Sequence, residues 1–148
     1  VDVASRNGGY VVGGVQVRKK AFIVKINNRK YYTALDQELD VEAMQKAAIY
    51  LEGKHDYKSF CGNSRMKKST VRIVDTIQIQ RRKGYVYLTF HGTGFLQNMV
   101  RIMAGTLIEV GLGRMQAEEV QDILEACDRK VAGPTAPAKG LCLMQVDY

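Results

Sequence analysis

The sequence predicts an α+β fold in which helices pack on one face of an antiparallel sheet. Apolar and polar residues alternate over 71–79 and 85–91, which is typical of two half-buried strands joined by a turn. Apolar residues recur at helical spacing over 41–51, 95–110 and 117–127. The expected order is strands, one helix, a hairpin, two helices and a final strand, which favours helices grouped beside an antiparallel sheet.

The central hairpin also indicates which side of its second strand is buried. Val86, Leu88 and Phe90 are the apolar positions of that strand, so they are expected to face the core. Arg81–Gly84 is expected to form a basic turn between the two strands. The wet face of the second strand would then carry Tyr85, Tyr87, Thr89 and His91.

The first predicted helix has a boundary signal at each end. Asp40 stands at the N-cap position, and Gly53 provides a C-terminal stop. Further strands are expected before it, over 10–12, 15–17 and 21–26, the first two forming a hairpin. A loop at 133–137 and a last strand at 141–146 complete the pattern.

Arg101 is the one charged residue in the first half of the helix predicted over 95–110. It falls beside Ala104 and Gly105, away from the main apolar face of that helix. A guanidinium flanked by small residues could approach another backbone segment or a carboxylate. The alternative is an ordinary solvated arginine.

The bulk properties restrict the class of protein. A chain of 148 residues fits one domain, and its formal net charge of +7 suits a polyanionic partner, although a basic protein with no nucleic-acid role is the alternative. Three cysteines without paired spacing argue against a disulfide framework or a zinc site, and Cys127 and Cys142 are expected in the core. With no apolar run of membrane length and no signal peptide, the expected location is the cytoplasm.

Four separated motifs occur along the chain. They are Leu39–Met44, His55–Phe60, Phe95–Arg101 followed by Gly105 and Glu109–Gly111, and Ala138–Leu143 followed by Val146–Tyr148. In this order and spacing they resemble the C-terminal half of TruA-type tRNA pseudouridine synthases. The resemblance runs from about Leu39 to Tyr148, whereas residues 1–38 match poorly.

This resemblance implies a single pseudouridine synthase-like domain over 1–148 and an isomerase activity on tRNA. Enzymes of the family break the C1′–N1 bond of a uridine in the anticodon stem-loop, turn the base and rejoin it through carbon. They use an aspartate, no metal and no cofactor, and they act as homodimers. The aspartate lies in a Gly-Arg-x-Asp-Ala-Gly motif that is absent here, so we expect the chain to complete an active site but to be inactive alone.

The same resemblance assigns four active-site residues. Arg101 matches the arginine that pairs with the catalytic aspartate, a role that suits a permanently charged, planar guanidinium. Leu141 and Leu143 match an apolar pair near the site, with ordinary strand core as the alternative for at least one of them. Phe22 stands where the family places a tyrosine against the base. Without the aspartate, Arg101 is expected to be solvent-accessible or to pair with another acidic group.

Phosphate contacts that position RNA without reading its sequence are expected from the basic residues of the matched region. A solvated loop residue is the alternative for each of them. Two other functions are alternatives to a tRNA pseudouridine synthase. One is a noncatalytic RNA-binding module on the same scaffold. The other is a small-molecule enzyme, for which no nucleophile–base pair or metal spacing is present. The expected RNA-binding residues are His55, Lys58, Arg65, Lys67, Lys68, Arg81, Arg82 and Lys83.

Overall fold

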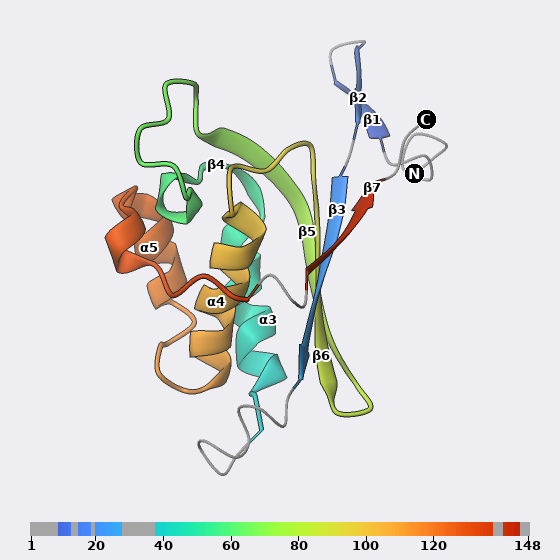
Figure 1. The fold of residues 1–148 in the computed structure, drawn as a ribbon, viewed down its shortest axis with the longest axis vertical. Helices are drawn as coiled ribbons and strands as arrows, with labels where there is room; N and C mark the ends of the chain where they lie inside the picture. Colours follow the sequence, from blue (N-terminus) through green and yellow to red (C-terminus); the bar gives the residue numbers. More distant parts are fainter. Residues whose placement is uncertain (1–8, 13–14, 19, 28–37, 138–140, 146–148) are drawn as a thin grey trace.

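One layer of the molecule is a five-stranded antiparallel sheet in the order β4-β5-β6-β3-β7 (Figure 1). The structure is a computed structural model that describes residues 9–12, 15–18, 20–27, 38–137 and 141–145, with side chains for 21–26 and 38–137. A separate two-stranded sheet pairs β1 with β2. The strands are β1 (Gly9–Val12), β2 (Val15–Arg18), β3 (Lys20–Asn27), β4 (Gly53–Asp56), β5 (Val71–Arg82), β6 (Tyr85–Gly92) and β7 (Leu141–Gln145).

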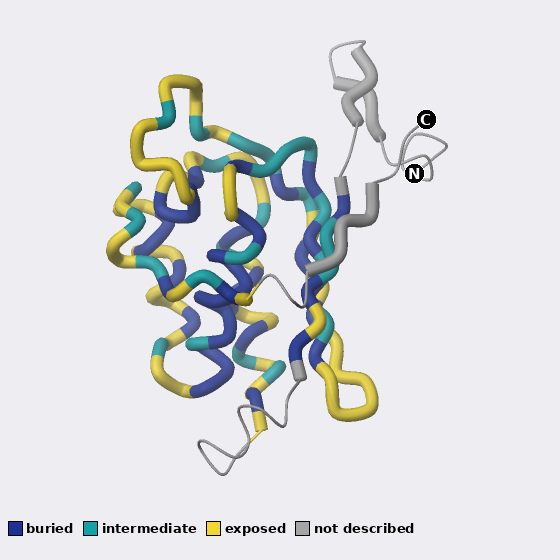
Figure 2. The backbone as a smooth tube through the Cα atoms, in the orientation of Figure 1, coloured by how far each residue is buried: buried dark blue, intermediate teal, exposed yellow. Residues whose placement is uncertain are grey.

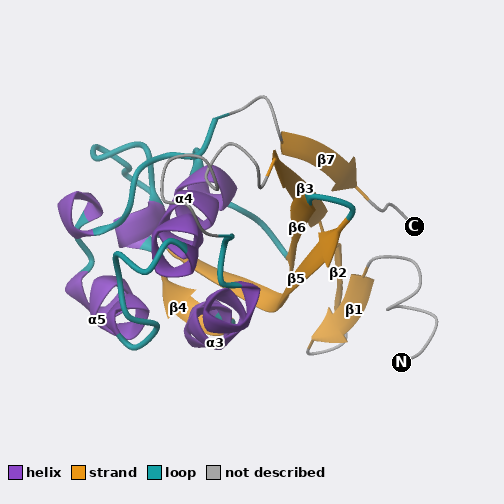
Figure 3. Cartoon of the chain, turned by 90° about the horizontal axis from the view of Figure 1, so that it is seen from below, coloured by secondary structure: helices purple, strands orange, loops and turns teal. Residues whose placement is uncertain are grey.

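The second layer consists of helices packed on one side of the sheet, as Figures 1 and 3 both show. Its helices are α3 (Val41–Leu51), α4 (Met99–Gly111) and α5 (Glu119–Ala126), with the short 3-10 helices η1 (Lys58–Phe60) and η2 (Arg129–Val131). This arrangement confirms the predicted α+β class with an antiparallel sheet covered on one face.

The β5–β6 hairpin buries the side that the sequence pattern predicted. Val86, Leu88 and Phe90 are fully buried, whereas the residues between them are exposed or half-buried. The predicted four-residue turn was too long, because β5 continues to Arg82 and only two residues turn the chain. Lys83 and Gly84 both have positive φ angles, 49° and 85°, which is the conformation of a tight hairpin turn.

Helix α3 has the boundaries that the sequence indicated. The Asp40 Oδ1 accepts a hydrogen bond of 3.1 Å from the backbone N–H of Ala43, which confirms the N-cap. Gly53 has a φ of 107°, which glycine adopts without strain and which ends the helix. The chain then continues directly into β4, an edge strand that was not predicted from the sequence.

Helix α4 begins later than expected and is buried on almost every side. Asn98 lies in the left-handed region at a φ of 59°, so the helix starts at Met99 and the residues from Phe95 precede it as a turn. The sequence predicted one apolar face, but Figure 2 shows α4 buried along most of its length. The additional cover comes from the loop after η2, which lies across the small side of the helix at Gly105.

Candidate active site around Arg101

Arg101 is the third residue of α4 and is half-buried. Its Nε donates to the carbonyl oxygen of Ala136 at 2.8 Å, and its Nη1 donates to the Asn98 Oδ1 at 3.3 Å. The Ala136 N–H in turn donates to the Arg101 carbonyl at 2.9 Å. The sequence left open whether Arg101 approaches another segment or is an ordinary solvated arginine. The hydrogen bonds with Ala136 show that it approaches another backbone segment.

The partner of Arg101 belongs to a short segment, Gly133–Ala136, which we call the strap. The strap lies so close to α4 that a Cβ on Gly105 would stand 1.6 Å from the Pro134 carbonyl oxygen. The Gly133 N–H donates to the Thr106 Oγ1 at 2.9 Å, and that hydroxyl donates to the Ile102 carbonyl at 2.9 Å. Gly105 therefore serves a close approach between two backbones rather than helix flexibility.

A second arginine, Arg129 of η2, holds the strap from its other side. Its Nη1 donates to the Gly133 carbonyl at 3.0 Å, and its Nη2 donates to the Thr135 Oγ1 at 3.1 Å. This residue was not predicted from the sequence, because next to Lys130 it resembles an ordinary charge at a helix C-terminus. No local signal marks it, since its partners lie four and six residues further on in a loop without regular structure.

The outer edge of the Arg101 guanidinium remains available. Its Nη2 has no hydrogen-bond partner among residues 21–26 and 38–137, whereas Nε and Nη1 hold the plane of the group. The expected pairing with another acidic group is not seen within that part of the chain, where Arg101 binds a carbonyl and an amide oxygen. A planar fork fixed on one side and open on the other can accept a carboxylate in one orientation.

Phe22 and the two leucines lie on adjacent strands. In the register of β3 with β7, Phe22 is opposite Leu143 and Val24 is opposite Leu141; the leucine side chains are outside the described set. The Phe22 ring is half-buried and meets the Phe95 ring edge-on, at 5.0 Å and 87°. Phe95 lies in the turn that leads into α4, so this aromatic pair stands at the same end of α4 as Arg101.

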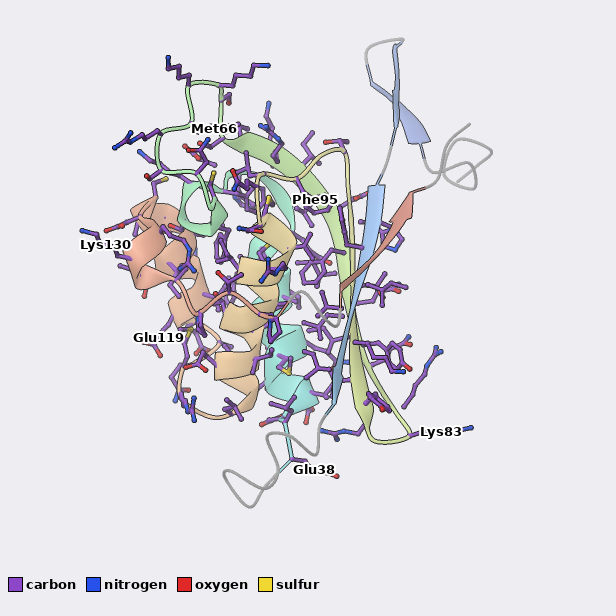
Figure 4. All side chains as sticks on the ribbon, viewed as in Figure 1. Glu38, Met66, Lys83, Phe95, Glu119 and Lys130 are labelled. Carbon is purple, nitrogen blue, oxygen red and sulfur yellow. The ribbon has the colours of Figure 1, made fainter. Side chains whose placement is uncertain are left out.

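The expected RNA-binding residues form two groups at opposite ends of β5, not one patch. Figure 4 labels Met66 in the loop over 61–70 and Lys83 in the β5–β6 turn, and the two lie at opposite ends of the molecule. Near the first end, Lys58, Arg65, Lys67 and Lys68 are exposed; at the other end, Arg81, Arg82 and Lys83 are exposed.

Three of these residues have side-chain partners within the chain. The His55 Nε2 lies 2.7 Å from the Glu52 carbonyl oxygen, and the ring is half-buried. Arg81 donates to the Leu39 carbonyl and lies 3.5 Å from the Glu38 carboxylate. The Arg82 Nη2 donates to the Gln80 Oε1 at 2.8 Å. All three therefore have structural partners that a purely phosphate-binding role would not require.

A groove of about 510 Å³ between α3, β4 and α5 lies apart from Arg101. His55, Asp56 and Cys127 contribute to its lining. The expectation that Cys127 is a core thiol was wrong, because it is half-exposed at the C-terminus of α5; Cys142 has no described side chain. Partial burial and the neighbouring Asp56 raise the pKa of the Cys127 thiol, so the thiolate is disfavoured there.

Neither a metal site nor a membrane-spanning helix occurs among the described residues. No group of three or more histidine, cysteine, aspartate or glutamate side chains in this set is arranged to hold a metal ion. No helix in the same set has the length and apolarity needed to cross a bilayer.

Known proteins of one family resemble this chain over most of its length. A family profile described as tRNA pseudouridine synthase matches residues 47–148. A protein from Brevibacillus brevis, named tRNA pseudouridine synthase A, is 43% identical over 140 residues, covering 90% of this chain and 57% of the relative. Proteins of the same name from Pelobacter propionicus and Moorella thermoacetica are 47% and 45% identical, covering 76% and 81% of this chain and 46% and 49% of the relatives. The chain thus spans about half the length of the curated relatives that it matches.

Proposed function

The chain belongs to the tRNA pseudouridine synthase family, and from this premise we propose that it supplies the C-terminal half of a TruA-type active site. The reaction is isomerisation of uridine to pseudouridine in the anticodon stem-loop of tRNA. The observation that carries the proposal is the half-buried Arg101, whose guanidinium is fixed by Ala136 and Asn98 and leaves Nη2 available.

Arg101 would act on a carboxylate that comes from outside this sequence, since the Gly-Arg-x-Asp motif is absent from it. A guanidinium next to an aspartate favours the charged carboxylate and keeps it ionised in a partly dry site. Because the plane of the guanidinium is fixed, a carboxylate bound at the Nη2 edge would also be held in one orientation toward the substrate. We further propose that an apolar pocket for the uridine base lies beside this carboxylate and is lined by Phe22, Leu141 and Leu143.

Several properties of the whole enzyme belong to the same proposal. The basic residues at the two ends of β5 would contact tRNA phosphates. His55 would contribute less because it is half-buried, and Arg81 because it pairs with the Glu38 carboxylate. Membership of the family favours an enzyme that acts as a homodimer in the cytoplasm and uses no metal or cofactor. The chain alone is proposed to be inactive.

The test is tritium release from 5-labelled uridine in tRNA by the full-length enzyme that contains this chain. Arg101→Ala should lower turnover by about 100-fold or more, since breaking a partly buried ion pair costs about 3–5 kcal/mol. tRNA affinity should remain nearly unchanged. Arg114→Ala is the matched control, because this exposed arginine follows α4 and pairs only with Glu109 within the described residues. Unchanged turnover in Arg101→Ala would remove Arg101 from the active site.

A noncatalytic RNA-binding module is the alternative, and a second measurement separates the two. The 148-residue chain alone should release no tritium, and the coding sequence around it should supply a Gly-Arg-x-Asp motif. If the complete gene product lacks that motif and binds tRNA without releasing tritium, the module is the correct assignment.

A further inference from the structure

The face of the sheet turned away from the helices carries a group of polar and aromatic side chains that the proposed active site does not use. Six of them form what we call the tyrosine patch: Lys25, Gln78, Gln80, Arg82, Tyr85 and Tyr87. The strand register places Tyr87 between Gln80 on β5 and Lys25 on β3, and it places Tyr85 opposite Arg82. Tyr87 is half-buried and the other five are exposed.

The tyrosine patch is positively charged, with two cations and no acidic residue. The nearest acidic residue in sequence, Asp75, lies at the bulge of β5 with one carboxylate oxygen buried. The helix layer differs, since its surface carries the exposed acidic residues Glu42, Glu118, Glu119, Asp122 and Glu125. This difference in charge between the two faces favours an anionic partner for the open sheet face. It disfavours a second helix layer with an acidic surface there.

The two tyrosine rings are arranged so that neither is stacked flat on the other. Their centroids are 6.5 Å apart and their planes are tilted by 58°. The Lys25 Nζ lies 4.1 Å from the centre of the Tyr85 ring and 5.8 Å from that of Tyr87, so a cation sits beside both rings. The Tyr85 side chain, 36% exposed, is among the large apolar residues that reach the surface.

The amide side chains add hydrogen-bonding capacity beside the rings. The Gln80 Oε1 accepts from the Arg82 Nη2 at 2.8 Å, which leaves the Gln80 amide N–H groups as donors. Gln78 lies one step along the same strand, on the same face. Aromatic rings, amides and cations on an open antiparallel sheet are the features by which proteins bind unstacked nucleotides.

We propose that the tyrosine patch binds unpaired RNA nucleotides, with bases against Tyr85 and Tyr87 and backbone phosphates near Lys25 and Arg82. That the RNA is tRNA rests on the proposed function. A protein occupant is less favoured, because the centre of a protein interface is depleted of charge, whereas charged and amide groups surround these rings.

The test uses the 148-residue chain and a fluorescein-labelled 12-nucleotide oligouridine, followed by fluorescence anisotropy. Tyr87→Ala and Tyr85→Ala should each weaken binding by about 5-fold or more, since stacking of one base on an aromatic ring is worth about 1–3 kcal/mol. Tyr87→Phe should stay within twofold of the wild type, because the ring is kept. Tyr50→Ala, a half-exposed tyrosine on α3, is the matched control and should not change affinity.

Lys25→Ala provides an independent readout through salt. Removal of one phosphate contact should lower the slope of log affinity against log salt by about 0.7 for single-stranded RNA. A fully paired RNA duplex of the same length should bind the Tyr87→Ala variant and the wild type equally, because its bases cannot reach the rings.

Two results would overturn the inference: no oligouridine binding by the wild type, and equal binding by folded Tyr87→Ala. If Tyr87→Ala keeps its RNA affinity but alters the sedimentation mass of the chain, the tyrosine patch is a protein interface. The tritium-release assay separates the two proposals. If the full-length enzyme releases tritium normally and Tyr87→Ala binds oligouridine as well as the wild type, only the tyrosine patch is rejected. If the enzyme releases no tritium and Tyr87→Ala binds oligouridine more weakly than the wild type, only the proposed function is rejected.

Discussion

At the scale of single residues, Arg129 shows how one side chain can hold the segment that positions another. It binds the strap, and the Ala136 carbonyl of the strap binds Arg101. Its two strap hydrogen bonds would be absent in Arg129→Ala, leaving the Gly133 carbonyl and the Thr135 hydroxyl without this donor. The free energy of unfolding should fall by about 1–3 kcal/mol, measured by urea denaturation. Lys130→Ala, a change at the exposed neighbour, should leave it within about 0.5 kcal/mol. Equal stability of both variants would mean that Arg129 does not hold the strap.

Tyr57 makes the stability of the fold depend on pH in the alkaline range. The side chain is fully buried, its hydroxyl lies 2.7 Å from the Leu51 carbonyl oxygen and 2.9 Å from that of Gly53, and burial raises its pKa well above the usual value. Below about pH 10 the phenol is neutral in both states, so its full contribution is present. Above that pH the unfolded state loses the proton first, and stability falls as pH rises.

Tyr57→Phe should therefore act differently at neutral and alkaline pH. At pH 7 the variant should lose about 1 kcal/mol, because the hydroxyl hydrogen bond is absent. Between about pH 10 and 12 its stability should fall less steeply than that of the wild type, by up to about 1.4 kcal/mol per pH unit. Tyr50→Phe, at a half-exposed tyrosine, is the control. Parallel pH profiles for Tyr57→Phe and the wild type would show that Tyr57 ionises normally.

The sequence predicted the environment of Arg101 better than that of Arg129. Arg101 stands beside Ala104 and Gly105 in an otherwise apolar helix, and such a gap indicates the approach of another segment. Arg129 has no comparable neighbours, and its partners exist only after the strap has packed on α4. Family resemblance suggested what Arg101 does, but only the structure shows which backbone atoms hold it.

At the scale of elements, the contact between α4 and the strap depends on the missing side chain of Gly105. In Gly105→Ala the new Cβ would meet the Pro134 carbonyl oxygen, which is backbone and cannot rotate away. Although alanine is the better helix former, we expect a loss of about 3 kcal/mol in urea denaturation, at the upper end of the overpacking range. Gly111→Ala is the matched control, because its Cβ would meet the flexible end of Met44 and should cost less than about 1 kcal/mol. Equal losses at the two sites would contradict this account.

Elements with a strong period could be predicted, and elements defined by their partners could not. The hairpin of β5 and β6 shows its alternation plainly, and Val86, Leu88 and Phe90 were assigned to the correct side. Strand β4 has no such pattern: Gly53–Asp56 is mostly exposed and is a strand only because it pairs with β5. The predicted start of α4 was too early, because no local sequence pattern indicates that Asn98 adopts the left-handed conformation.

At the scale of the whole molecule, the separation of the two basic groups has a measurable consequence. Strand β5 has 12 residues and spans about 36 Å, so an RNA touching both ends must be long or folded. The double variant Lys67→Ala/Lys68→Ala should weaken tRNA binding and lower its salt slope by up to about 1.8, because each phosphate that is no longer neutralised lowers the slope by about 0.9. Lys46→Ala, an exposed lysine on α3, should leave the slope unchanged. A double variant with the wild-type slope would place the loop over 61–70 outside the RNA interface.

The strap also limits how the chain can vary in length. Both ends of the strap are hydrogen-bonded to α4, one through Thr106 and the other through Arg101. The distance between these two helix residues therefore fixes how many residues the strap can contain between its two hydrogen bonds. The loop over 61–70 carries no such double attachment to a helix within the described chain, and its tip is exposed. Natural or engineered insertions should accumulate at that tip, whereas even one extra residue between Gly133 and Ala136 would displace the Arg101 guanidinium, on which the proposed active site depends.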